Sequence, residues 1–169
     1  MSTALTPETD NPALATTFRE LMANVCTPVS VVTAMDDHRP HGSTVSAFAS
    51  LSMDPPMVLV SLNAESRLLT IIRKTGRFGL NILAADQSAH AGAFASRSDD
   101  RFAGISWDED HQVPRLGGVL GWLACEVADL IDGGDHVIAL GHVLATQNVA
   151  TDPLTYHLRA FGTHTTRLG

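Results

Sequence analysis

Two long stretches with the composition of β-strands, residues 121–131 and 136–148, are separated only by Asp132-Gly133-Gly134-Asp135. Gly and Asp tolerate the backbone conformations that tight hairpin turns require, so this spacing predicts an antiparallel hairpin. The other strand-like stretches do not alternate regularly with helices. We therefore expect an antiparallel β-barrel of about six or seven strands with short flanking helices, not a doubly wound parallel sheet.

A second stretch, residues 42–62, begins with hydroxyl side chains that alternate with small or apolar ones. The hydroxyls belong to Thr44, Ser46, Ser50 and Ser52. This period of two predicts one strand with an uncharged polar face, which ends at Asp54-Pro55-Pro56 before a buried strand over residues 57–62. The polar face suits a neutral, flat ligand with polar edges, or it is simply the solvent side of a barrel strand pair.

Shorter patterns place the remaining elements. Asn11-Pro12 is typical of a helix start, and the apolar spacing that follows predicts a helix from Pro12 to about Cys26, packed on the core or on another subunit. Ser66 and Gly76 bracket a second predicted helix. We expect further strands over residues 29–34, 78–83 and 159–165, the last of which closes the barrel. We also expect a helix over 87–96 and a loop over 107–116.

Length and composition describe an ordinary globular protein. The 169 residues predict one domain over residues 11–169, preceded by a polar, mobile arm over residues 1–10. A net charge of −7 argues against binding to nucleic acid or to an anionic membrane. No apolar run is long enough to span a bilayer, and the first residues lack the pattern of a secretory signal, so we expect a cytoplasmic protein.

Motifs for self-sufficient catalysis are absent from the sequence. It contains no glycine-rich dinucleotide or phosphate loop and no Gly-x-Ser-x-Gly elbow. Cys26 and Cys125 form no disulfide or zinc pattern, and His136 and His142 share a strand face without a third ligand, so no metal site is expected. These absences favour an organic cofactor that supplies the chemistry while the protein supplies its position.

Seven segments, in this order, carry a family resemblance: PVSVVTA, GSTVSAFASLSMDPPMVLVSLN, SRLLTIIRKTGRFGLNIL, FASRSDDRF, GWLACEV, GDHVIALGHV and PLTYHLRAF. Together the segments resemble the small flavin reductases of two-component flavin-dependent monooxygenases, the FMN-binding split-barrel group. The resemblance implies a mainly β, Greek-key-like split β-barrel and a homodimer with flavin sites near the subunit boundary. It also implies an NAD(P)H-dependent flavin reductase that passes a hydride from NADH to FMN or FAD and releases reduced flavin to a partner monooxygenase.

The same resemblance implies roles for individual residues. Those implied to edge the flavin ring are Thr44, Val45, Ser46 and Ala47. Those implied near the ribityl chain and phosphate are Ser50, Ser61, Leu62, Asn63 and Ser66. Those implied on the phosphate or adenine side are Phe94, Ala95, Ser96, Arg97 and Phe102. Those implied at the nicotinamide are Gly134, Asp135, His136, Tyr156 and Arg159, with His136 in the catalytic position.

Two alternatives remain open from the residues. One is a split barrel with tightly held FMN and its own substrate, similar to pyridoxamine-phosphate oxidase. The other is a flavin-binding protein without turnover. The sequence leaves FMN and FAD undistinguished. It leans towards NADH over NADPH because no additional run of Arg and Lys marks a site for the 2′-phosphate.

Overall fold

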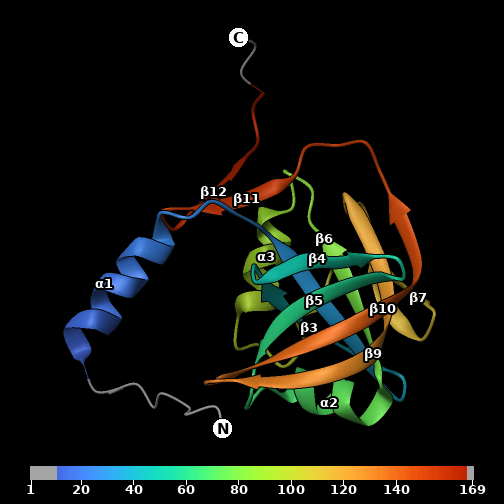
Figure 1. The fold of residues 1–169 in the computed structure, drawn as a ribbon. Helices are drawn as coiled ribbons and strands as arrows, with labels where there is room; N and C mark the ends of the chain where they lie inside the picture. The colour runs from blue at the N-terminus through green and yellow to red at the C-terminus, as the bar shows by residue number, and fades with distance from the viewer. Residues whose placement is uncertain (1–10, 167–169) are drawn as a thin grey trace, which may run out of the picture.

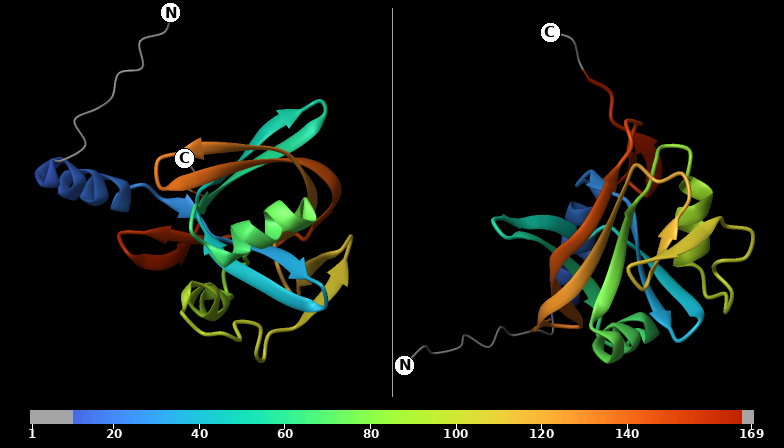
Figure 2. Two further views of the ribbon diagram at one scale, coloured as in Figure 1. Left: turned by 90° about the horizontal axis from the view of Figure 1, so that it is seen from below. Right: turned by 90° about the vertical axis from the view of Figure 1, so that its right-hand side faces the viewer.

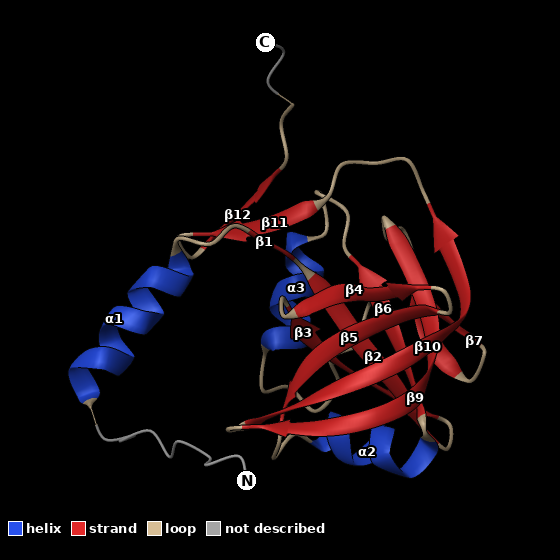
Figure 3. Cartoon of the chain, viewed as in Figure 1, coloured by secondary structure: helices blue, strands red, loops and turns tan. Residues whose placement is uncertain are grey.

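The computed structural model describes residues 11–166 as a strand-rich fold with three helices (Figures 1 and 3). The predicted mobile arm, residues 1–10, lies outside the described residues. The helices are α1 (Pro12–Ala23), α2 (Arg67–Thr75) and α3 (Ser88–Ala95). None of the helices within residues 11–166 is long and apolar enough to cross a membrane.

The main sheet has seven strands, all paired antiparallel. Their order is β3 (Arg39–Val45), β2 (Ser30–Asp36), β6 (Arg77–Ile82), β9 (Gly121–Gly133), β10 (His136–Asn148), β5 (Pro56–Asn63) and β4 (Phe48–Met53). The sheet curls so that its two edges approach each other, as the end-on view in Figure 2 shows. The expected split-barrel architecture is therefore confirmed, although no ladder of hydrogen bonds joins β3 to β4 among the described residues.

The predicted hairpin is confirmed. Gly133 pairs with His136, and Gly134 takes the left-handed conformation (φ 68°) that the tight turn needs. The β9–β10 hairpin separates β5 from β6, although these two strands are close in sequence. This order agrees with the Greek-key-like expectation, since chain neighbours β5 and β6 lie on opposite sides of the hairpin.

The prediction of one continuous strand over residues 44–52 is wrong. The chain leaves the sheet at Ser46-Ala47, so β3 and β4 form opposite edges. Hydrogen bonds from Phe48 N to the Ser46 carbonyl (3.2 Å) and from Ser61 N to the Ala47 carbonyl (2.9 Å) hold this crossing. The hydroxyls consequently do not form one face. Thr44 Oγ1 donates to the carbonyl of Ala91 in α3, whereas Ser50 is exposed on β4.

Two further sequence predictions need correction. Residues 107–116 form a hairpin of β7 (Trp107–Asp110) and β8 (Val113–Leu116), not a loop, because Val113 and Leu116 are buried against the main sheet. The last strand, β12 (Ala160–Thr163), does not close the main sheet. It pairs with β11 (Leu154–His157), which also pairs with β1 (Thr27–Pro28).

The core has two parts, one on each face of the curled sheet. Inside the curl, the buried face of α2 closes one end over Val32, Val60 and Phe78 (Figure 2). Outside it, α3 and β8 pack on the opposite face, where Val31 is buried. Cys125 lies in the inner part, and burial raises the pKa of its thiol to about 12, as expected of an inert core residue.

Asn81 fastens β8 to the outer face of the sheet. Its side chain is fully buried, and its Nδ2 donates to the carbonyl of Val31 and to Thr33 Oγ1, both at 3.2 Å. Its Oδ1 accepts a hydrogen bond from Leu116 N at 2.8 Å. The amide that interrupts an otherwise apolar strand is thus fully paired, as a buried amide must be.

Helix α1 begins as predicted, with Asn11 Oδ1 accepting a hydrogen bond from Leu14 N (3.1 Å), and ends at Ala23. None of its residues is buried, so the expected packing on the core is wrong. The helix projects from the rest of the fold (Figure 1). Its apolar face, made by Leu14, Phe18, Leu21 and Met22, is exposed in this chain.

Gly141 tests the packing inside the curl. A Cβ at this position would lie 2.6 Å from Phe78 Cζ and 3.0 Å from Cys125 Cβ. We expect Gly141→Ala to lower the free energy of unfolding by about 1–3 kcal/mol, measured by urea denaturation, because the core must move to admit the methyl group.

The matched control is Gly92→Ala in α3, where a Cβ meets no atom within 4 Å. This variant should keep or raise stability, by up to about 1 kcal/mol, since Ala favours a helix more than Gly does. Equal stability of both variants would contradict the close packing of β10 on Phe78.

Candidate functional site

The register between β10 and β5 joins two of the segments singled out in the sequence. His136 pairs with Asn63, and the Ala64 backbone N donates to the carbonyl of Asp135 at 3.0 Å. Residues 61–66 and 134–136 therefore lie side by side, although about 70 positions separate them in the chain. The hydrogen bond from Ser61 N to the Ala47 carbonyl places the residues just before β4 in the same region.

The hairpin turn holds His136 through its neighbour. His136 Nδ1 lies 2.7 Å from Asp135 Oδ1, and this contact lowers the pKa of the Asp135 carboxyl. The carboxylate thereby fixes the ring orientation of a half-buried imidazole. Asp135 therefore has two structural roles, since it belongs to the tight turn and its carboxylate contacts the His136 ring.

The start of α2 forms the next part of the site. Ser66 Oγ accepts a hydrogen bond from Leu69 N (3.2 Å), and Asn63 Oδ1 accepts one from Glu65 N (2.9 Å). These caps orient the first helical turn, which contains no acidic residue. Backbone N–H groups and the helix dipole make such a terminus favourable for an anion when other groups complete the site.

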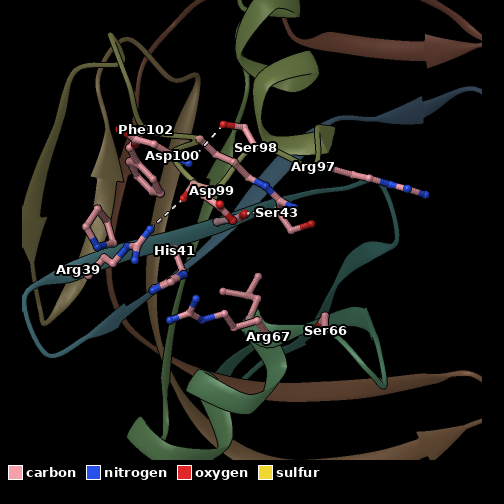
Figure 4. Close-up of a pocket in the computed structure, with 14 residues that line it drawn as sticks. Arg39, His41, Ser43, Ser66, Arg67, Arg97, Ser98, Asp99, Asp100 and Phe102 are labelled. Atoms are coloured by element: carbon pink, nitrogen blue, oxygen red, sulfur yellow. Dashed lines mark hydrogen bonds between the residues drawn. The ribbon is translucent and has the colours of Figure 1, made fainter.

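A cleft of about 530 Å³ opens beside this helix start (Figure 4). We call it the arginine cleft. Three segments line it: residues 39–43 of β3, residues 66–68 at the start of α2, and residues 97–102 after α3. Figure 4 shows Ser66 at one end of the cleft and Arg39 at the other, with His41 between them.

Positive charge predominates in the arginine cleft. Four arginines line it, Arg39, Arg67, Arg97 and Arg101, against two aspartates, Asp99 and Asp100. Two of the guanidinium groups are held by backbone oxygens, so their charge is not neutralised by those bonds. Arg39 Nη2 donates to the Asp99 carbonyl (3.0 Å), and Arg101 Nη1 donates to the carbonyls of Gly42 (3.0 Å) and Phe94 (3.2 Å).

His41 adds an unpaired polar atom to the cleft wall. Its Nε2 is buried and has no hydrogen-bond partner among residues 11–166. Burial first, and then the nearby Arg67 and Arg39, lower the pKa of its imidazole, so the ring is neutral at pH 7. A neutral imidazole can donate a hydrogen bond or accept one without adding charge.

The structure groups some of the predicted site residues and separates others. Ser66, Arg97 and Phe102 line the arginine cleft. Those on the adjoining strand ends are Thr44, Val45, Ser46, Ala47, Ser61, Leu62 and Asn63. Phe94 is a core residue with its ring edge-on to Phe102 (4.8 Å between centroids), and Ala95 and Ser96 end α3 beside it.

Tyr156 and Arg159 lie apart from the His136 turn. Tyr156 belongs to β11 and pairs with Thr27, and its ring lies 5.2 Å from that of Phe161. No hydrogen bond or ion pair links either residue to the turn in the part of the chain described. Their predicted place at the nicotinamide stays a prediction.

Sequence reasoning missed most of the arginine cleft. The residues it did not single out are Arg39, Pro40, His41, Gly42, Ser43, Arg67, Leu68, Ser98, Asp99, Asp100 and Arg101. Taken one at a time, these residues are typical of turns or of the protein surface. The density of arginine around the helix cap and in the Ser96–Phe102 segment was the only available signal. No group of three or more His, Cys, Asp or Glu suited to a metal occurs within residues 11–166.

The chain matches known proteins along most of its length. Residues 22–165 match the family model described as a flavin reductase like domain. The reductase component of a 4-nitrophenol 4-monooxygenase/4-nitrocatechol 2-monooxygenase from Rhodococcus opacus is 39% identical, over 86% of this chain and 78% of that protein. A flavin reductase (NADH) from Kitasatospora aureofaciens is 35% identical, over 86% and 79%.

A solved structure also agrees closely with this fold. The nitrilotriacetate monooxygenase component B homologue from Mycobacterium thermoresistibile superimposes with a TM-score of 0.87 at 34% identity. The match covers 90% of this chain and 88% of that one. The similarity therefore extends through the elements that carry both the His136 turn and the arginine cleft.

Arg101 tests how the cleft wall is held. Replacing it with Gln removes the hydrogen bonds to Gly42 and Phe94. We expect Arg101→Gln to lower the free energy of unfolding by about 1–3 kcal/mol in urea denaturation, because partly buried carbonyls lose a charged donor. The control Arg97→Gln alters an exposed side chain and should change stability by less than about 0.5 kcal/mol. Equal losses would show that Arg101 does not fasten residues 97–102.

Proposed function

This chain belongs to the flavin reductase like family, and from that premise we propose that it is an NADH-dependent flavin reductase supplying reduced flavin to a partner monooxygenase. The observation that carries the proposal is the β10–β5 register. It sets the His136 turn beside the start of α2, which itself borders the arginine cleft. A hydride donor and a phosphorylated acceptor can then be held next to each other in one chain.

The residues present fit a flavin. A flavin nucleotide joins a flat ring with polar edges to a phosphorylated chain. The strand ends around Ser46, Ala47 and Ser61 offer backbone groups and hydroxyls without charge, whereas the helix start and the arginine cleft favour anions. The buried, unpaired His41 Nε2 is a polar atom that a ligand in the cleft would satisfy.

Each part of this chain has a positional role. The Ser66 cap keeps the first N–H groups of α2 directed at a phosphate. The Asp135 carboxylate fixes the imidazole of His136, which we place beside the nicotinamide. The residues around the start of α2 and the His136 turn would hold the flavin and the nicotinamide next to each other. The flavin would supply the hydride acceptor, so this chain needs to provide proximity and orientation and no general base.

We also propose that the chain acts as a homodimer in the cytoplasm. The apolar face of α1 is exposed in the single chain, with Phe18 58% and Leu21 62% accessible, which is costly for a free helix in water. A second copy covers this face in the proposed dimer. NADH as the hydride donor supports a cytoplasmic site of action.

Sedimentation equilibrium tests the dimer. We expect the protein to sediment as a dimer, and a Phe18→Ser/Leu21→Ser variant as a folded monomer, because both side chains are exposed in the single chain and no residue of α1 is buried. A monomeric unmodified protein would contradict the proposed dimer.

The flavin reductase assignment is tested by the loss of NADH absorbance with and without added FMN, FAD or riboflavin. We expect oxidation that depends on added flavin and saturates with it. Oxidation that ignores added flavin would favour a tightly held prosthetic group, and flavin binding without any oxidation would favour a carrier. Either of these results contradicts the proposal.

His136 tests the arrangement of the two substrates. We expect His136→Ala to raise the KM for NADH several-fold more than the KM for flavin, since the imidazole is placed at the nicotinamide. The control His142→Ala changes an exposed imidazole in the same strand, opposite Met57, and should leave both values unchanged. Equal increases in both KM values would remove His136 from this role.

A further inference from the structure

One broad surface of the main sheet has no second layer over it within residues 11–166. It is the outer side of β9, β10 and β5, which is turned toward the viewer in Figure 1. Ile138 pairs with Ile131 of β9, and Leu140 pairs with Leu59 of β5. Because every second residue of a strand points to the same side, these side chains lie together. We call them, together with Met57, the outer sheet face.

The outer sheet face is apolar, whereas a sheet surface that meets water is normally polar. None of its five residues belongs to either core of the described chain, and Ile131 is 44% exposed. Residues 57–60 read MVLV and residues 137–140 read VIAL. Such continuous apolar runs are typical of strands that are covered on both faces. The composition of β5 and β10 therefore fits a sheet with a second layer on this side.

Helix α1 carries an apolar surface of matching size. Its exposed stripe is formed by Leu14, Phe18, Leu21 and Met22. A helix of 12 residues is about 18 Å long, and the part of β10 from residue 136 to residue 142 covers about 20 Å. A helix stripe and an open sheet face are the two surfaces that commonly pack on each other in folded proteins.

The edges of these two surfaces carry opposite charges. Glu126 and Asp129 lie on the outer side of β9, where Asp129 pairs with Leu140. Arg19 is exposed in α1, next to Phe18 in the chain. None of these three charged side chains forms an ion pair within residues 11–166. Packing of the stripe on the outer sheet face would give Arg19 carboxylates to pair with.

The helix is held away from the outer sheet face of its own chain. The Ala23 carbonyl, at the end of α1, accepts a hydrogen bond from Leu158 N at 2.8 Å. Only residues 24–26 separate this end from β1, where Thr27 pairs with Tyr156. Both ends of the short link are thus fixed on the β11–β12 hairpin, and α1 projects outward (Figure 1). The α1 of a second copy has no such restraint.

We propose that α1 of each copy packs on the outer sheet face of the other, so that the dimer forms by a reciprocal exchange of helices. This inference rests on the proposed homodimer and identifies its contact surfaces. With two-fold symmetry the contact occurs twice, so each one needs to bury only half of the roughly 1,200–2,000 Å² that stable interfaces bury.

The exchange also completes the site around the hairpin turn. His136 and Asn63 pair with each other, and each lies an even number of residues from the members of the outer sheet face on its own strand. They therefore lie on the same side of the sheet, at the end of that face. The helix of the second copy would form a wall beside the His136 imidazole, and the nicotinamide side of the site would be incomplete in a single chain.

Disulfide trapping tests the contact without relying on activity. In a Cys26→Ser background, Phe18→Cys or Leu21→Cys is combined with Leu59→Cys or Leu140→Cys, and each variant is oxidised with copper phenanthroline. We expect at least one pair to give a covalent dimer on a non-reducing gel, because these side chains would face each other across the interface. A disulfide within one chain, or no disulfide in any of the four variants, would overturn the proposal.

The matched control combines Thr16→Cys with Leu140→Cys in the same background. Thr16 lies on the opposite side of α1 from the apolar stripe, so this variant should remain a single chain after oxidation. Cys125 is buried and its thiol has a pKa of about 12, so it does not compete. A covalent dimer in the control as well would show random collision and would count against the proposal.

Sedimentation equilibrium tests the sheet side of the contact. We expect Leu140→Glu to dissociate the dimer, because it places a charge at the centre of the outer sheet face, with the fold checked by circular dichroism. The control Val149→Glu changes an exposed apolar residue beyond the end of β10 and should remain a dimer. A dimeric Leu140→Glu variant beside a monomeric Phe18→Ser/Leu21→Ser variant would place the helix on another surface.

Steady-state kinetics tests the effect on the site. We expect Phe18→Ser/Leu21→Ser to raise the KM for NADH roughly tenfold, since the monomer lacks the wall that the second copy supplies. An unchanged KM in a proven monomer would show that the helix takes no part in the site. Failure of the unmodified protein to reduce any flavin is a different outcome, since it rejects the proposed function and leaves the trapping result as it is.

Discussion

The antiparallel pairing of β10 with β5 on one side and β9 on the other is the interaction on which the rest of the structure depends. It joins the two halves of the curled sheet, because β5 and β4 lie on one side of the hairpin, and β6, β2 and β3 on the other. The same ladder fixes His136 opposite Asn63. A slip of one residue would turn His136 to the other face of the strand and remove it from the site.

The local concentration of positive charge in the arginine cleft complements this framework. A chain with a net charge of −7 repels anions on average, so an anionic substrate needs a local positive surface. The arginine cleft provides it by assembling residues from β3, α2 and the segment after α3. Because Arg39 and Arg101 are held by backbone carbonyls, the guanidinium groups are positioned without being neutralised.

The sequence predicted the features that local chemistry determines. The glycine turn of the β9–β10 hairpin, the Ser66 cap and the Gly76 stop of α2 each follow from residues within a few positions. The family resemblance added the split-barrel fold and the activity. That His136 lies beside Asn63 could not be predicted in this way, because it depends on the register between β10 and β5, which no single segment determines.

Features that depend on tertiary contacts were missed. The break at Ser46-Ala47 exists because the chain crosses between the two edges of the sheet, and no Gly or Pro marks it in the sequence. The β7–β8 hairpin contains charged residues and lacks a regular alternation of polar and apolar side chains. It is ordered by tertiary contacts, namely the hydrogen bond from Leu116 N to Asn81 Oδ1 and the burial of Val113. The arginine cleft was not predicted from the sequence because its arginines come from three separated segments of the chain.

Hydrogen–deuterium exchange with and without saturating FAD would test the central claim most directly. The claim is that the flavin occupies the surface formed by the β3–β4 crossing, the start of α2, the arginine cleft and the His136 turn. The account predicts slower exchange in residues 42–47, 61–68, 97–102 and 134–136, and unchanged exchange in the β7–β8 hairpin. Protection confined to β7–β8 or to β11–β12, with none at the start of α2, would contradict it.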